Sequence, residues 1–136
     1  MKNIGISEKS TKKVKAVGAT QVGKKHDRAA TDAENYSFPR GGKLWKDTGF
    51  QGCEPTGVTT YQPKKKPKGQ ALTLDEKAQN KVISQARIGV ERTLGGVKVF
   101  HILRDGYRNH KENFEDLVME PACGLHNLRM DFSLAA

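Results

Sequence analysis

A long amphipathic helix is the best-defined element in the pattern of apolar and polar positions. Its apolar residues recur every three or four positions and would form one stripe along a helix. They are Val82, Ile83, Ala86, Val90 and Leu94. Thr73 and Glu76 have the spacing of a capping box, and Gly95-Gly96 is typical of a helix end. The pattern therefore predicts a helix over about residues 74–94.

Shorter elements are predicted before this helix. Apolar side chains at even spacing predict a hairpin of two strands over residues 3–22, with one face buried. A short helix is expected to run from Asp27, its N-cap, to about Asn35. The segment Lys43 to Lys46 is then predicted as a short strand that delivers Asp47 at its C-terminal end.

Loops and a second helix complete the predicted chain. Residues 49–69 are expected to be mostly loop. Within them, the segment 62–69 is rich in lysine and contains two prolines, which favours an extended, solvated arm. Apolar residues at helical spacing predict a last helix over about 111–130, where Pro121 should kink the helix or end its first half.

Composition favours one domain and a polyanionic partner. The chain has 136 residues, with 24 Lys and Arg against 15 Asp and Glu, and a formal net charge of +9. This length suits a single domain over residues 1–136, and the basic balance indicates nucleic acid as partner, although a basic, inert surface is the alternative. The expected DNA-binding residues lie in the basic loop 62–69. They are Lys64, Lys65, Lys66 and Lys68.

Cysteine spacing and hydropathy exclude several classes of protein. Cys53 and Cys123 lack the Cys-x-x-Cys spacing of zinc sites, and nothing suggests a disulfide framework. The first 13 residues contain no apolar block of the length that a signal peptide needs. No stretch approaches the roughly 18 to 20 apolar residues that span a bilayer. We therefore expect a soluble, intracellular protein with reduced thiols and no membrane partner.

Acidic side chains are expected on two rigid elements. Asp47 would end a strand, and Glu91 would lie on the long helix one turn after Arg87. Cleavage of phosphodiesters by two divalent ions needs several carboxylates at one place, because Mg²⁺ prefers hard oxygen ligands. Lys98 could reach a DNA phosphate as a point charge. Taken alone, Arg87 and Glu91 also fit an ordinary surface ion pair, and Asp47 fits a common turn.

Five motifs in series resemble the catalytic C-terminal part of insertion-sequence transposases of the DDE superfamily, which includes the Harbinger-like endonucleases. The resemblance covers about residues 2–130. The motifs are, in order, Gly23–Asp27, Asp47–Gly52, Pro63–Gly69, Arg87-x3-Glu91-x6-Lys98 and Cys123–Asn127. The resemblance implies an α/β structure with a partial ribonuclease H-like fold. Its elements would be an N-terminal hairpin, a short helix, a short strand, a long helix that carries the catalytic glutamate, and a C-terminal helix.

The resemblance also implies roles for individual residues. The second catalytic aspartate of the family falls on Asp47 and its catalytic glutamate on Glu91. Arg87 and Lys98 would be the supporting basic residues of a Tyr-Arg-Glu-Lys signature, in which Ser84 replaces the tyrosine. The implied metal ligands are Asp27, Asp47 and Glu91. The implied cofactor is a divalent cation, Mg²⁺ or Mn²⁺.

The main departure from the family is at the start of the chain. The first aspartate of the family lies on the central first strand of its fold, and no acid precedes Asn3 here. We therefore expect a C-terminal catalytic fragment of a transposase that is inactive alone, since one metal ligand is missing. Its parent would cleave and join DNA at transposon ends and target sites, in the bacterial cytoplasm at the nucleoid.

Three hypotheses follow for the chain itself. The first is this transposase fragment, with an upstream-frame transposase product as a further partner. The second is a non-catalytic basic DNA-binding protein derived from a transposase. The third is a reading frame that never folds stably.

Overall fold

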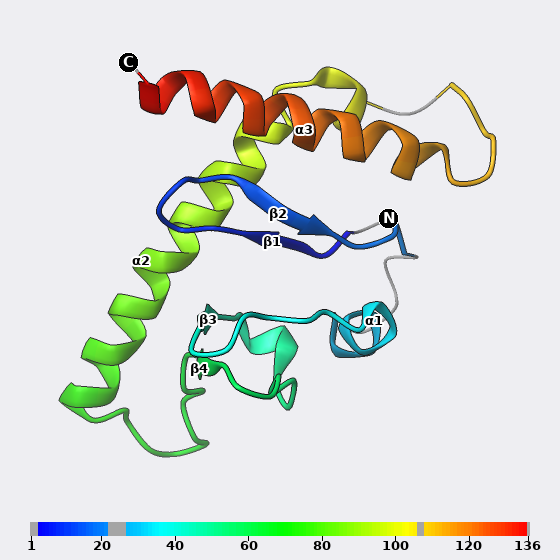
Figure 1. The fold of residues 1–136 in the computed structure, drawn as a ribbon. Coiled ribbons are helices and arrows are strands. Elements are labelled where there is room, and N and C mark those ends of the chain that lie inside the picture. Colours follow the sequence, from blue (N-terminus) through cyan, green and yellow to red (C-terminus); the bar gives the residue numbers. More distant parts are fainter. Residues whose placement is uncertain (1–2, 22–26, 106–107, 136) are drawn as a thin grey trace. The chain divides into compact units, whose positions relative to one another are not determined.

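Mixed α/β structure with two small sheets makes up the described chain (Figure 1). The structure, a computed structural model, describes residues 3–21, 27–105 and 108–135. The chain divides into two compact units. Unit 1 is Met1–Lys24 with Gly89–Ala136, and unit 2 is Lys25–Ile88. Each unit has its own two-stranded sheet, and the expectation of one domain over the whole chain stays a prediction.

The predicted hairpin of unit 1 is confirmed, with shorter strands than expected. Strand β1 (Gly5–Ser7) pairs antiparallel with β2 (Val14–Val17), and the register is irregular between Ile6 and Ser7. Its second strand ends well before Val22, which lies outside the described residues. The two paired strands therefore form a short two-stranded sheet.

The predicted C-terminal helix is also confirmed, as α3 (Phe114–Ala135). It contacts β2 and the short 3-10 helix η2 (His101–Leu103). Pro121 lies inside the helix and does not end it, and the expected kink stays a prediction. Proline removes one backbone hydrogen bond of the helix. Burial of Ala122 and Cys123 directly after it offsets that loss.

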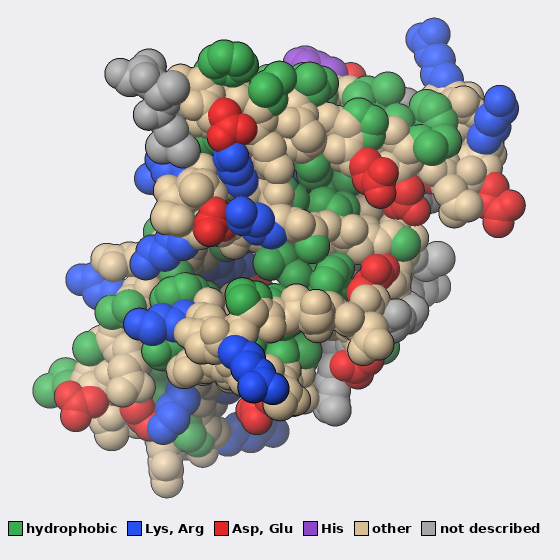
Figure 2. All heavy atoms as spheres, viewed as in Figure 1, with side chains coloured by type: hydrophobic (Ala, Val, Ile, Leu, Met, Phe, Trp, Pro, Cys, Tyr) green, Lys and Arg blue, Asp and Glu red, His purple; other side chains and the backbone are tan. Residues whose placement is uncertain are grey.

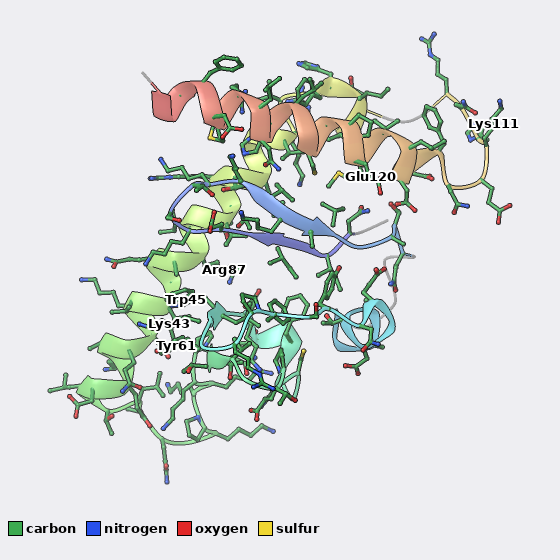
Figure 3. All side chains as sticks on the ribbon, in the orientation of Figure 1. Lys43, Trp45, Tyr61, Arg87, Lys111 and Glu120 are labelled. Carbon is green, nitrogen blue, oxygen red and sulfur yellow. The ribbon has the colours of Figure 1, made fainter. Side chains whose placement is uncertain are left out.

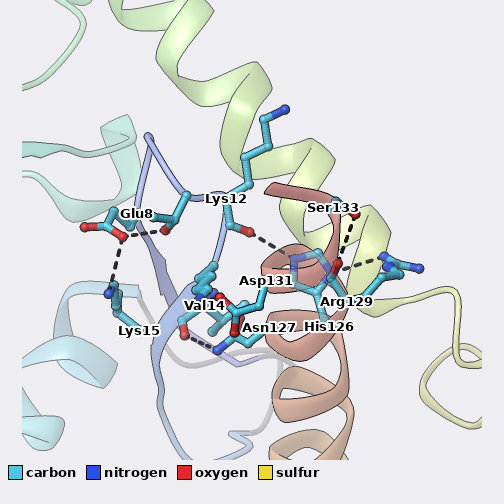
Figure 4. Close-up of polar contacts among 11 residues, drawn as sticks. Glu8, Lys12, Val14, Lys15, His126, Asn127, Arg129, Asp131 and Ser133 are labelled. Atoms are coloured by element: carbon cyan, nitrogen blue, oxygen red, sulfur yellow. Dashed lines mark hydrogen bonds and ion pairs between the residues drawn. The ribbon is translucent and has the colours of Figure 1, made fainter. Parts of the chain in front are cut away.

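A polar clamp joins α3 to the hairpin (Figure 4). Asn127 accepts a hydrogen bond from the Val14 amide at 2.7 Å and donates one to the Val14 carbonyl at 2.8 Å. His126 is buried, and its Nε2 lies 3.0 Å from the carbonyl oxygen of Lys12. A carbonyl can only accept, so Nε2 carries the proton, and Nδ1 accepts from Arg129 at 3.2 Å. The two last residues of the Cys123–Asn127 motif thus fasten the hairpin.

Apolar side chains fill the space around this clamp. The buried cluster consists of Val14, Val97, Ala122 and Cys123. Partly buried Val17, Phe100, Leu103 and Met119 pack against it. Burial raises the pKa of the Cys123 thiol, so this side chain behaves as a small apolar residue.

The central helix α2 (Leu74–Val97) begins as predicted and ends later. Its capping box is confirmed, because the Glu76 amide donates to Thr73 Oγ1 at 3.2 Å and the Thr73 amide donates to Glu76 Oε2 at 3.0 Å. The predicted end at Gly95-Gly96 was wrong. A Cβ on Gly96 would lie 2.7 Å from His126 Cε1, whereas one on Gly95 would meet nothing within 4 Å. Gly96 serves the close approach of α3 rather than a helix end.

The predicted apolar stripe of α2 is only partly buried. Ala86 and Val97 are buried, and Thr93 is buried with its hydroxyl donating to the Gly89 carbonyl at 3.1 Å. Val82, at the N-terminal end of the stripe, is 60% exposed. Polar Thr93 takes a place on the buried face because its hydroxyl finds a partner one turn back.

Unit 2 contains a parallel pair of strands, only one of which was predicted. Strand β3 (Lys43–Trp45) pairs with β4 (Thr59–Tyr61), a segment that was expected to be loop. The rings of Trp45 and Tyr61 stack with centroids 5.4 Å apart (Figure 3). Two threonines and a tyrosine have no apolar alternation, and the partner strand is distant in sequence, so no local pattern indicated β4.

The predicted short helix of unit 2 is present as α1 (Asp27–Glu34). Ala30 of this helix is buried, and the helix contacts the 3-10 helix η1 (Thr48–Phe50). The side chain of Asp27 lies outside the described part of the structure, and so does its expected N-cap role.

Candidate metal and DNA-binding residues

Asp47 occupies a fixed position directly after β3. It is the N-cap of η1, where its Oδ1 accepts a hydrogen bond from the Thr48 amide at 2.7 Å. Its backbone carbonyl accepts a second bond, from Gln62 Nε2 at 2.8 Å. The side chain is 40% exposed, so the carboxylate is held in place and still reaches solvent. This combination suits a metal ligand, and it equally suits a turn residue.

Arg87 on α2 forms an ion pair with Asp47 within unit 2. Its Nη1 lies 3.5 Å from Asp47 Oδ1, and its side chain is 59% exposed. An exposed pair of this length contributes at most about 1 kcal/mol. The ion pair therefore places the Asp47 side chain next to α2, and the carboxylate remains accessible to a second cation.

Glu91 and Lys98 belong to unit 1, where both are exposed. Glu91 lies four residues after Arg87 on the same helix, so the two side chains share one helical face a turn apart. Lys98 follows the last residue of α2, and its amide donates to the Leu94 carbonyl at 3.0 Å. The roles assigned to these residues in catalysis stay predictions.

Metal ligation by the three acids stays a prediction as well. Among the residues that the structure describes, no group of three or more His, Cys, Asp or Glu side chains could hold a metal ion. This statement does not include Asp27, whose side chain is not among those that the structure describes. Of the three expected ligands, Asp47 lies in unit 2 and has the hydrogen bonds described above, whereas Glu91 lies exposed on α2 in unit 1.

The basic loop 62–69 lacks regular structure, as predicted, and Lys64 to Gly69 are exposed. It is nevertheless attached to α2. The amide of Lys64 donates to Asn80 Oδ1 at 2.9 Å, and Asn80 Nδ2 donates to the Lys64 carbonyl at 3.1 Å. Lys64 Nζ also lies 2.8 Å from Glu76 Oε1. This bond, followed by the bond from the Thr73 amide, holds the pKa of Glu76 below its usual value.

Two residues of this region were missed by sequence reasoning. Asn80 and Gln62 are polar residues without a motif of their own, and their partners lie 16 and 15 residues away in the chain. Only the pairing of a loop with a helix face gives them a role. No spacing rule could have indicated it.

Charged side chains of both signs are visible among the described residues (Figure 2). In the face that Figure 2 shows, blue Lys and Arg side chains alternate with red Asp and Glu side chains. The DNA-binding assignment rests on the local lysines of the loop. In the described part of the chain, none of the helices has the length and apolar character needed to cross a membrane.

Comparison with known proteins identifies the family. The sequence profile of the DDE superfamily endonucleases matches residues 6–127. The chain is also 33% identical over 92 residues to a probable transposase for insertion sequence element IS702 from Microchaete diplosiphon, a match that covers 68% of this chain and 33% of that protein. The chain thus spans about a third of the length of this relative. No solved structure matches. The chain belongs to the DDE superfamily of endonucleases, as a homologue of insertion-sequence transposases.

Proposed function

We propose that this chain is the catalytic part of a DDE transposase, in which Asp47 and Glu91 bind divalent metal ions that cleave and join DNA strands. The observation that carries the proposal is the position of Asp47. Asp47 follows strand β3, its carboxylate caps the N-terminus of η1, and Arg87 Nη1 lies 3.5 Å from the same carboxylate. Glu91 lies four residues after Arg87 on the same helix.

The donor set suits a hard cation. Carboxylate oxygens are the ligands that Mg²⁺ and Mn²⁺ prefer, and Asp47 is exposed enough to accept one. Two bound metal ions would supply the chemistry: one would activate the attacking oxygen and the other would stabilise the leaving oxygen. In this proposal Arg87 orients the Asp47 carboxylate, and Lys98 neutralises a phosphate of the DNA strand. Asp27 contributes a further carboxylate.

We propose further that the chain forms part of a ribonuclease H-like fold. Support comes from the order of its elements, which is hairpin, short helix, two parallel strands and two long helices. Both sheets have only two strands, and each has edges on which further strands could pair. The match covers about a third of the transposase relative, and we propose that the remaining acid of the site belongs to the part of the parent enzyme, or of an upstream-frame product, that lies beyond this match. Alone, the chain would then be inactive.

A second candidate function is DNA binding without catalysis. Lys65, Lys66 and Lys68 are exposed on an anchored loop, which favours contact with phosphates at transposon ends or target sites. Both candidates place the protein with DNA, at the bacterial nucleoid. They differ in whether divalent ions are needed.

Removal of metal separates these candidates. In a chimaera, this chain replaces the matching third of the IS702 relative, so that the missing parts of the parent are supplied. We expect nicking of transposon-end DNA in Mg²⁺, loss of nicking in EDTA, and recovery when Mn²⁺ is added. Gel analysis of nicked plasmid measures the product. Nicking that persists in EDTA would contradict the metal-dependent mechanism, and binding that ignores Mg²⁺ without any nicking would favour the second candidate.

A further inference from the structure

The loop between β4 and α2 is closed at both ends on the same helix. At its start, Lys64 is bound by Asn80 through both backbone groups, at 2.9 and 3.1 Å. At its end, Thr73 forms the capping box of α2 with Glu76. The chain turns between these two points, where the Gln70 amide donates to the Pro67 carbonyl and Gly69 has a φ of +80°. The lysine-rich segment is thus a clasped loop, here defined as residues 64–73.

Neighbouring turns of α2 supply the two halves of this clasp. Asn80 and Glu76 are four residues apart, so their side chains lie on one helical face. Glu76 binds both ends of the loop, since its carboxylate accepts from the Thr73 amide at 3.0 Å and from Lys64 Nζ at 2.8 Å. Asn80 binds Lys64 as a paired strand would, by one donated and one accepted bond. One helix face therefore fixes where the loop leaves and where it returns.

The four lysines of the loop are not equivalent. Lys64 has its amide, its carbonyl and its ammonium group engaged by α2. Lys65, Lys66 and Lys68 follow on the exposed part of the loop. A partner that contacts Lys64 must compete with Glu76, whereas contact with the other three leaves the clasp intact. Lys64 thus anchors the loop to α2, whereas Lys65, Lys66 and Lys68 are exposed on the same loop.

We propose that the Asn80 clasp holds Lys65, Lys66 and Lys68 in position for the phosphates of a DNA strand, and that Lys64 is an anchor rather than a DNA contact. This inference rests on the DNA binding proposed above and departs from the sequence-based expectation, which treated Lys64, Lys65, Lys66 and Lys68 alike. A loop held in one conformation loses less entropy on binding than a free arm, so the same contacts bind more tightly. Just before the loop, Gln62 Nε2 donates a hydrogen bond to the Asp47 carbonyl at 2.8 Å. This bond fixes the start of the loop next to the candidate catalytic acid.

Salt dependence of DNA binding tests the division among the lysines. The slope of log K against log salt is negative, and each phosphate contact that is lost should reduce its magnitude by about 0.9. For the full chain and a short duplex, we expect this decrease for Lys65→Gln, Lys66→Gln and Lys68→Gln. We expect no decrease for Lys64→Gln, because its ammonium group stays with Glu76. Fluorescence anisotropy at several salt concentrations measures all four.

The clasp itself is tested by Asn80→Leu, with the neighbouring Gln79→Leu as the matched control. Loss of the clasp should weaken binding about threefold to tenfold, as expected when a few side chains must be ordered on binding, while the salt slope stays that of the wild type. Gln79→Leu should bind as the wild type does. The lysine variants keep the inference testable if Asn80→Leu fails to fold, because substitutions at exposed lysines leave stability nearly unchanged.

Outcomes separate this inference from the proposed function. If Lys64→Gln reduces the magnitude of the slope as much as Lys66→Gln, or if Asn80→Leu binds like its control, the clasp proposal is wrong while DNA binding stands. If the wild-type chain shows no salt-dependent binding at all, the DNA-binding proposal fails and the inference fails with it.

Discussion

Asp47→Asn and Glu91→Gln should each reduce nicking by the chimaeric transposase at least about a hundredfold. Replacing a carboxylate by an amide keeps the shape and removes the charge that holds a divalent cation. Metal ions contribute several kcal/mol of transition-state stabilisation in such sites, and each 1.36 kcal/mol is a factor of about ten in rate. Asp47→Asn can still accept the Thr48 amide at the N-cap of η1, so the fold should survive the change.

Matched controls keep this prediction specific. Asp105→Asn, on the segment after η2, makes the same chemical change at an acid that the proposed site does not use. Glu120→Gln does so on α3 (Figure 3). Asp105→Asn is the control for Asp47→Asn and Glu120→Gln the control for Glu91→Gln, and both should nick DNA at the rate of the parent chimaera. Single-turnover rates measured with saturating Mg²⁺ decide the matter. Equal rates for Asp47→Asn and its control would refute the assignment of Asp47.

Gly96→Ala should lower the free energy of unfolding by about 1 to 3 kcal/mol, the usual effect of overpacking a buried contact. The new Cβ would lie 2.7 Å from His126 Cε1 and 2.9 Å from His126 Nδ1. The imidazole cannot yield easily, because it is buried and bound to the Lys12 carbonyl. The strain would therefore spread to the clamp between α3 and the hairpin.

Gly95→Ala is the natural control for this change. It lies next to Gly96 in the same helix, and its Cβ would meet nothing within 4 Å. Alanine is favoured over glycine inside a helix by up to about 1 kcal/mol, so this variant should be slightly more stable than the wild type. Urea unfolding followed by circular dichroism measures both. Two variants of equal stability would show that Gly96 is not a contact point.

Local signals explain how much of the fold was predictable. Thr73 and Glu76 announce the start of α2 because both partners of the capping box lie within one turn. The hairpin, the short helix, β3 and the C-terminal helix follow from spacing in the same way. Gly95-Gly96 misled the prediction because the same residue type serves a helix end and a close helix contact. Only the position of His126 distinguishes the two.

Long-range partners explain the rest. Asn127 binds Val14 over 113 residues, and Asn80 binds Lys64 over 16, each through both backbone groups of its partner. Nothing in the sequence marks these asparagines as different from a surface polar residue. For the candidate site, the sequence and the family indicated Asp47, Arg87 and Glu91. The ion pair of Arg87 with Asp47 and the Gln62 bond to the Asp47 backbone required a structure.

The central proposal is that Asp47 and Glu91 bind the same metal ion, and a double-mutant cycle tests it most directly. Mn²⁺ affinity is measured by electron paramagnetic resonance in the chimaera, in Asp47→Asn, in Glu91→Gln and in the double variant. If both acids hold the same ion, each single change should weaken binding strongly and the double change should add little, a large coupling between the two. Two effects that simply add, or a Glu91→Gln variant that binds Mn²⁺ as the parent does, would contradict the claim.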